Sequence, residues 1–310
     1  MRIGVMIGEE VLGQQADLER LVRQARQAEE RGFASAWVPH IFGVDAIVAL
    51  AIAGRETRRI ELGTAVIPTF TRHPFTLAQQ ALTVQVASEG RFTLGIGLSH
   101  RFIVEGILGL SYEKPTRHMR EYLSVLVPLL EGGSVTHRGE VYRVDGELRF
   151  PIEDRVPVLV AALGPAMLRL AGSLGAGTVT WMTGPRTLET HVVPCIRAAA
   201  EDAGRPEPRI VAMFPIAVAH APDRGREVAG RLFRRYGCAP AYRAMLDREG
   251  VAGPADVAIV GDAATVEAEL RRLADTGVTE VMAVPFSSDE GAIERTLDFL
   301  SSTATGRTFR

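Results

Sequence analysis

Residues 60–100 read IELGTAVIPTFTRHPFTLAQQALTVQVASEGRFTLGIGLSH, with two apolar runs on either side of a helical pattern. The runs at 60–68 and 92–98 are typical of buried strands. Pro74 begins a stretch with apolar residues at helical spacing, which predicts a helix. Two strands joined by a crossover helix are normally parallel, so both end at the same edge of the sheet. The small residues near these ends therefore predict half of a ligand pocket.

The same alternation of strand and helix continues along the chain. Helical patterns separate most of the remaining strand-like runs, as at 16–31, 44–56, 165–174 and 264–276. Strands are predicted at 2–7, 34–39, 60–68, 92–98, 157–161, 178–181, 210–219 and 280–285. This order predicts an α/β fold, a (β/α)8 TIM barrel. An open doubly wound sheet would carry a glycine fingerprint after the first strand, which residues 8–13, GEEVLG, do not provide.

Two segments are longer than a plain strand and helix unit. An insertion of about 101–156 follows the fourth strand, with a predicted helix at 114–130 and a hairpin near 134–150. Two extra helices are predicted within about 222–256, before the eighth strand, around 226–236 and 241–249. We therefore expect a single TIM-barrel domain over 1–301 and a polar tail over 302–310.

Composition excludes several classes of protein. The chain has 310 residues, 46% of them hydrophobic and 23% charged, and a formal net charge of −2. This near-neutral charge argues against nucleic acid as a partner, and the apolar run at 46–53 is too short to cross a membrane. The first residues do not resemble a signal peptide, so we expect a cytoplasmic protein. Cys195 and Cys238 are isolated and no histidines cluster, so we expect no metal site.

In a barrel of this kind, function resides where the strands end. Several predicted strand ends carry small residues and others carry aromatic ones, an arrangement that lets a flat ring lie close to the backbone. Gly164-Pro165 and Gly184-Pro185 each stand at a predicted helix start, where free N–H groups favour an anion. Together these features predict a large planar phosphorylated cofactor.

Four segments carry a family resemblance: LGTAVIPTFTRHP, GRFTLGIGLSH, VAALGPAMLRLAG and GTVTWMTGP. Together, in this order, they resemble the luciferase-like monooxygenase superfamily. More narrowly, they resemble its branch of oxidoreductases that use the deazaflavin coenzyme F420, such as the methylenetetrahydromethanopterin reductases. The resemblance extends over nearly the whole chain and implies a TIM barrel with an insertion after the fourth strand.

The resemblance also implies which residues form the cofactor site. It implies a non-prolyl cis peptide bond at Ala65–Val66 behind the deazaflavin ring, with Gly97 and Ser99 beside the ring. It implies that the cofactor tail lies along 161–164 and that its phosphate lies near Thr183 and Gly184. The full set of expected cofactor contacts is Pro39, His40, Thr64, Ala65, Val66, Gly97, Ser99, Ala161, Ala162, Leu163, Gly164, Trp181, Thr183 and Gly184.

The activity implied is hydride transfer between coenzyme F420 and a small organic substrate with a C=N, C=C or C=O bond. His40, His100 or Glu9 would handle the proton, because imidazole titrates near neutrality and Glu9 lies in the first loop. His40 is favoured by its position at a strand end. Sugar-phosphate dehydrogenases of this branch have Asp before that histidine, whereas this chain has Pro39, which argues against glucose 6-phosphate as the substrate.

The sequence is also compatible with two alternatives. One is an FMN-dependent monooxygenase on the same barrel. The other is a barrel without redox chemistry, either a lyase or a cofactor-binding protein without turnover. A lyase would need a strand-end lysine or a carboxylate metal site, and Lys114 lies instead at a helix start in the insertion. We expect a homodimer.

Overall fold

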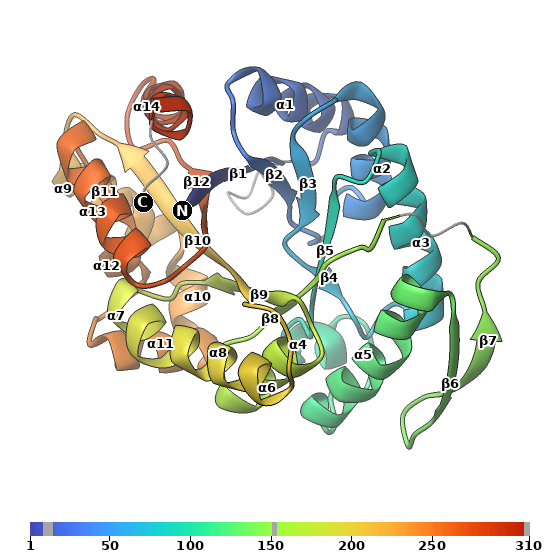
Figure 1. Ribbon diagram of the computed structural model, residues 1–310. Coiled ribbons are helices and arrows are strands. Elements are labelled where there is room, and N and C mark those ends of the chain that lie inside the picture. The colour runs from blue at the N-terminus through green and yellow to red at the C-terminus, as the bar shows by residue number, and fades with distance from the viewer. Residues whose placement is uncertain (9–14, 151–153, 307–310) are drawn as a thin grey trace.

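The strands of the chain close into a barrel. The computed structural model describes residues 1–8, 15–150 and 154–306. Within these residues, eight parallel strands pair in the order β1-β2-β3-β5-β8-β9-β10-β12, and β12 pairs with β1 to complete the ring. They are β1 Arg2–Met6, β2 Ser35–Val38, β3 Glu61–Thr64, β5 Phe92–Gly97, β8 Val158–Ala161, β9 Gly177–Trp181, β10 Arg209–Val218 and β12 Glu280–Pro285. The predicted TIM barrel is confirmed (Figure 1).

Helices surround the barrel (Figure 1). Aspartate side chains cap three of them, since Asp17, Asp45 and Asp262 accept hydrogen bonds from backbone N–H groups in the first turn. No helix among the described residues is long and apolar enough to cross a membrane. The helices are α1 Leu18–Glu30, α2 Ala46–Glu56, α3 Pro74–Ala87, α4 Arg101–Gly106, α5 Pro115–Gly132, α6 Pro165–Ser173, α7 Pro185–Thr187, the π-helix η2 Leu188–Val192, α8 Val193–Asp202, α9 Pro222–Leu232, α10 Arg234–Cys238, α11 Pro240–Glu249, α12 Pro254–Val257, α13 Ala263–Asp275 and α14 Ala292–Gly306.

Two clusters of buried apolar side chains stabilise the barrel and the helices around it. The larger one joins outward-facing strand residues such as Leu62 and Ile210 to the inner faces of the helices, where Leu50 and Leu123 are buried. The second includes Met6, Trp37, Trp181, Met282 and Phe286. Burial of apolar surface on both faces explains why the barrel strands read as continuous apolar runs.

The predicted insertion contains α4, α5 and the antiparallel hairpin β6 Ser134–Arg138 and β7 Arg143–Glu147. The carboxylate of Glu121 on α5 holds the hairpin turn, because it accepts backbone N–H bonds from Glu140, Val141 and Tyr142 at 3.2, 2.8 and 2.9 Å. His118 on the same helix lies stacked on Phe70, with ring centroids 4.0 Å apart. The hairpin and α5 therefore support the segment that follows the third strand.

The structure differs from the sequence expectations at four places. The third predicted strand is interrupted, and its end forms a separate strand, β4 Ile67–Pro68. A short strand, β11 Ile259–Gly261, pairs with the end of β10 and was not predicted. The extra region contains α9 to α12 instead of two helices. Finally, α14 continues through Gly306, so the boundary expected at residue 302 falls inside a helix.

A network of charges closes the N-terminal end of the barrel. Arg209 forms ion pairs with Glu61 and with Glu280, the latter at 2.6 Å. Arg2 also pairs with Glu61, at 2.6 Å. The Trp37 indole donates to Glu280 at 2.9 Å, and the Glu280 side chain is fully buried. These residues lie at the opposite end of the barrel from the strand ends that form the candidate site.

Candidate active site

The third strand ends in a bulge. Residues 65–66 separate β3 from β4, while β5 runs continuously past both strands. The peptide bond between Ala65 and Val66, the bond that the family resemblance implies, is cis. The Thr64 hydroxyl donates to the Gly95 carbonyl at 2.8 Å and accepts from the Gly95 N–H at 2.9 Å. Thr64, an expected cofactor contact, is thus fully buried, and its hydroxyl replaces the missing backbone pairing.

Glycines on β5 make room for this bulge. A Cβ atom on Gly95 would lie 2.0 Å from the Thr64 carbonyl oxygen. One on Gly97 would lie 2.7 Å from Val66 Cγ2 and 3.1 Å from Ala161 Cβ. The side chains of Val66 and Ala161 therefore both approach Gly97, from the strands on either side of β5, and both are half-buried. These small side chains form a continuous apolar floor across the ends of three neighbouring strands.

His40 is held at the other edge of this floor, two residues beyond β2. Its Nδ1 lies 3.3 Å from the Ala46 N–H nitrogen and its Nε2 lies 3.4 Å from Arg72 Nη1. Arg72 also forms an ion pair with Asp45, and Tyr122 donates to its carbonyl at 3.0 Å. The Ala46 N–H and the Arg72 guanidinium are donors, so each ring nitrogen of His40 lies beside a donor group.

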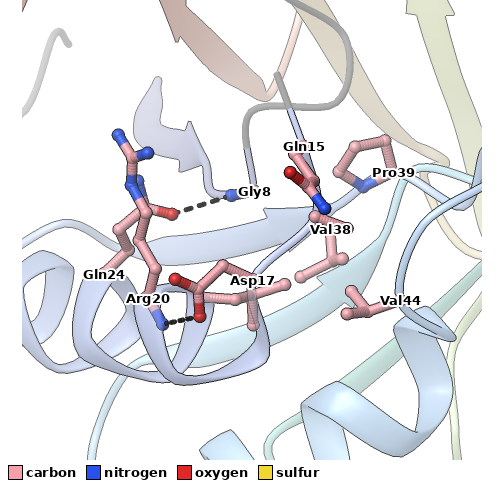
Figure 2. A pocket seen from close by; sticks show the side chains of 10 residues that line it. Gly8, Gln15, Asp17, Arg20, Gln24, Val38, Pro39 and Val44 are labelled. Carbon is pink, nitrogen blue, oxygen red and sulfur yellow. Dashed lines mark hydrogen bonds between the residues drawn. The ribbon is translucent and has the colours of Figure 1, made fainter. Parts of the chain in front are cut away.

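Pro39 is buried and lines a small pocket between the end of β2 and the start of α1 (Figure 2). The Gly8 N–H closes one side of this pocket by donating to the Gln24 side chain at 2.9 Å. Val38, Val44 and Gln15 also line it. Glu9, the third residue expected to handle the proton, lies outside the described residues.

His100 contributes to a group of aromatic rings at the mouth of the barrel, the end where the barrel strands finish. Its ring lies against Phe102 and Tyr242, with centroids 5.6 and 5.5 Å away. Burial lowers the pKa of His100 below its usual value. Tyr242 contacts Tyr236, and Tyr236 contacts Trp181, each at 5.5 Å. Among the described residues, the buried indole N–H of Trp181 has no hydrogen-bond partner.

Two strand ends carry residues with left-handed backbone conformation. Ser99, beyond β5, has φ 63°, and Met182, beyond β9, has φ 53°. The Ser99 carbonyl accepts a long hydrogen bond of 3.4 Å from the Tyr112 hydroxyl. Non-glycine residues seldom adopt this conformation, and they cluster at functional sites when they do. The backbone conformation at the ends of β5 and β9 is therefore typical of a ligand site.

The two helix starts expected to bind phosphate differ. At α7, the Glu249 carboxylate accepts from the Arg186 and Thr187 N–H groups at 3.1 and 2.7 Å, and it lies where a Gly184 Cβ would stand. A phosphate there would meet this carboxylate, which disfavours the expected phosphate site at Thr183 and Gly184. Thr183 is also buried.

At α6, by contrast, the N-cap Gly164 is exposed and makes no side-chain cap. The first-turn N–H groups of α6 therefore remain available to an anion. The two residues before Gly164 take part in packing and hydrogen bonding within the fold. Ala162 is buried, and the Leu163 carbonyl accepts from His191 Nε2 at 2.8 Å.

The mouth fits a planar phosphorylated cofactor. The apolar floor offers a surface for a ring, the unpaired Trp181 N–H offers a donor, and the start of α6 offers an anion site. No group of three metal-ligating side chains occurs among the described residues. Strand-end reasoning did not find Asp45, the N-cap of α2, nor Tyr242 and Glu249, which come from α11, distant in sequence.

Comparison with known proteins places the chain among enzymes. Residues 1–280 match the family model described as luciferase-like monooxygenase. A 5,10-methylenetetrahydromethanopterin reductase of Archaeoglobus fulgidus is 32% identical over 163 residues, which are 52% of this chain and 49% of that relative. An F420-dependent glucose-6-phosphate dehydrogenase of Microbacterium testaceum is 30% identical over 238 residues, 72% of this chain and 70% of the relative. The chain thus matches about half the length of the first relative.

Solved structures share the fold. The coenzyme F420 dependent tetrahydromethanopterin reductase of Methanopyrus kandleri superimposes with a TM-score of 0.80 at 21% identity, over 97% of each chain. The oxygenating constituent of 3,6-diketocamphane monooxygenase of Pseudomonas putida, in complex with FMN, gives a TM-score of 0.75 at 19% identity. That match covers 98% of this chain and 97% of the other.

Proposed function

Because the chain belongs to the luciferase-like monooxygenase family, we propose that it is an oxidoreductase that uses coenzyme F420. The observation that carries this proposal is the apolar floor of Ala65, Val66 and Ala161 beside the open start of α6. When bound, the coenzyme supplies or accepts a hydride. The ring would lie on the floor, beside Gly97 and Ser99, and the phosphate would lie at the first turn of α6.

In this arrangement His40 exchanges the proton that accompanies hydride transfer. It stands at the edge of the floor, and its ring is held by two donors, the Ala46 N–H and Arg72. A neutral imidazole is the form that accepts a proton from a substrate hydroxyl or amine. His100 packs between aromatic rings, so we assign it to the wall of the site.

The substrate that we infer is uncharged and apolar. Exposed apolar side chains surround the mouth, with Phe42 and Phe102 both 65% exposed. Two arginines close to these side chains are paired: Arg72 with Asp45, and Arg101 with Glu105 at 2.7 Å. A phosphorylated sugar would find no unpaired cation in these pairs, so an apolar imine, alkene or ketone fits better.

Titration with the two candidate cofactors tests the proposal. The purified protein should change the fluorescence of coenzyme F420 on binding and should bind FMN more weakly. A screen of apolar imines, alkenes and ketones should then find an acceptor that oxidises the reduced coenzyme. Tight FMN binding without F420 binding would favour the FMN-dependent monooxygenase instead. Binding of F420 without turnover across the screen would favour a binding protein.

We also propose that the protein is a homodimer whose contact includes α2 and α3. Val48 and Ile52 lie one turn apart on α2 and are 55% and 40% exposed, and Val86 on α3 is 57% exposed. These helices lie close together, since a Cβ on Gly54 would be 2.9 Å from Ser88 Cβ. A second copy of the same surface would bury these side chains.

The variant Val48→Glu/Ile52→Glu should therefore shift the protein from dimer to monomer, because it would bury four carboxylates at a two-fold contact. Light scattering coupled to size-exclusion chromatography measures the mass. Leu232→Glu on α9, at a residue 39% exposed, is the matched control and should remain dimeric. A monomeric wild type, or a dimeric double variant, would contradict the proposal.

A further inference from the structure

A second site lies beside the candidate cofactor mouth, between α5 and α6. These helices contact each other in the ring of helices around the barrel (Figure 1). A cavity of about 390 Å³ separates part of them. Its walls include Thr116 and Arg120 from the start of α5, and Ala166, Arg169 and Ser173 from α6. Ala166 belongs to the first turn of α6, so the cavity begins at the same helix start as the proposed phosphate site.

The cavity carries uncompensated positive charge. Arg120 and Arg169 are both exposed, and neither guanidinium forms an ion pair with another residue in the part of the chain that the structure describes. Other cations of α5 and its start differ in this respect, since Arg117 and Lys114 both lie against Glu140. Two unpaired guanidinium groups on one cavity attract anions, and carboxylates are the anions that guanidinium matches in shape.

We propose that this cavity binds the acidic oligoglutamate tail of coenzyme F420, with Arg120 and Arg169 pairing with its carboxylates. This inference rests on the proposed function. The tail is joined to the cofactor phosphate, so a phosphate at the start of α6 leads the tail directly to Ala166 and the cavity. Leu170 and Leu174 also line the cavity and offer an apolar surface to the methylene groups of the tail.

The test compares two forms of the coenzyme, one with several glutamates and one without any. Equilibrium titration of coenzyme fluorescence should show that the wild type binds the glutamate-bearing form about 3- to 30-fold more tightly at low salt, the range expected for two partly exposed charge pairs. The preference should shrink as salt is added. Arg120→Gln/Arg169→Gln should abolish the preference and leave the affinity for the tail-free form unchanged. Arg224→Gln, on α9, is the single-charge control and should keep the full preference.

The outcomes separate this inference from the function on which it rests. Equal affinity of the wild type for both forms would overturn the tail site alone, as would a double variant that keeps the preference. Failure of the wild type to bind either form would overturn the proposed function and the tail site with it. Loss of affinity for both forms in the double variant would assign these arginines to the fold or to the phosphate instead of the tail.

Discussion

Replacing His40 with Gln is expected to lower turnover of the best substrate in the screen by about 10²- to 10⁴-fold, the range typical of general acid–base catalysis. Glutamine can still accept a hydrogen bond from the Ala46 N–H or from Arg72, the two donors that hold the ring. The glutamine side chain cannot take up a proton near neutral pH. Steady-state rates over a range of pH measure the effect, and the limb of the profile that reports the histidine should disappear in the variant.

His100→Gln is the comparison for this variant. His100 is packed against Phe102 and Tyr242, and burial already disfavours its charged form. We therefore expect its replacement to change substrate or coenzyme affinity more than the turnover number. Coenzyme titration should show that His40→Gln still binds the coenzyme. Unchanged turnover in His40→Gln, or a larger loss of turnover in His100→Gln, would move the proton-transfer role away from His40.

The barrel could be predicted from the sequence because its signals are local and repeated. Each strand is an apolar run, and most are followed by a helical pattern with its own start signals, such as Pro74 or Gly164-Pro165. The elements that were missed lack such signals. β11 has only three residues and depends on pairing with the long β10, and the interrupted third strand depends on its contacts with β5.

The candidate site could be predicted only in part. Position at a strand end indicated His40, and the resemblance implied the cis bond at Ala65–Val66, which the structure contains. Chain order could not reveal that Glu249, from a helix more than sixty residues later, reaches the start of α7. Chain order also could not show that the Thr64 hydroxyl forms a hydrogen bond with the Gly95 backbone. Such contacts arise from tertiary packing, which a single sequence does not encode as a local pattern.

The charge network at the N-terminal end of the barrel also could not be predicted from the sequence. A change in this network has the largest expected effect on stability. Arg209→Met should lower the free energy of unfolding by about 3–5 kcal/mol, the cost of removing one partner from a buried ion pair. Arg209 faces two carboxylates, Glu61 and Glu280, and Glu280 is fully buried. Methionine fills similar space but leaves both carboxylates without their shared partner. Urea unfolding followed by circular dichroism measures the loss.

The pH dependence of this loss distinguishes lost charge pairing from lost packing. Burial raises the pKa of Glu61, but the charges of Arg209 and Arg2 outweigh it and hold that pKa below its ordinary value of 4.5. A carboxyl with a lowered folded-state pKa stabilises the protein above its ordinary pKa and loses this contribution as the pH falls through the folded value. The difference in unfolding free energy between wild type and Arg209→Met should therefore narrow below about pH 4.5.

The control is Arg197→Met, which breaks an exposed pair with Glu207 and should lower the free energy of unfolding by less than about 1 kcal/mol at any pH. A gap for Arg209→Met that stays constant with pH would mean that the guanidinium stabilises the barrel by packing against the Trp37 ring, 5.4 Å away, and not by its charge.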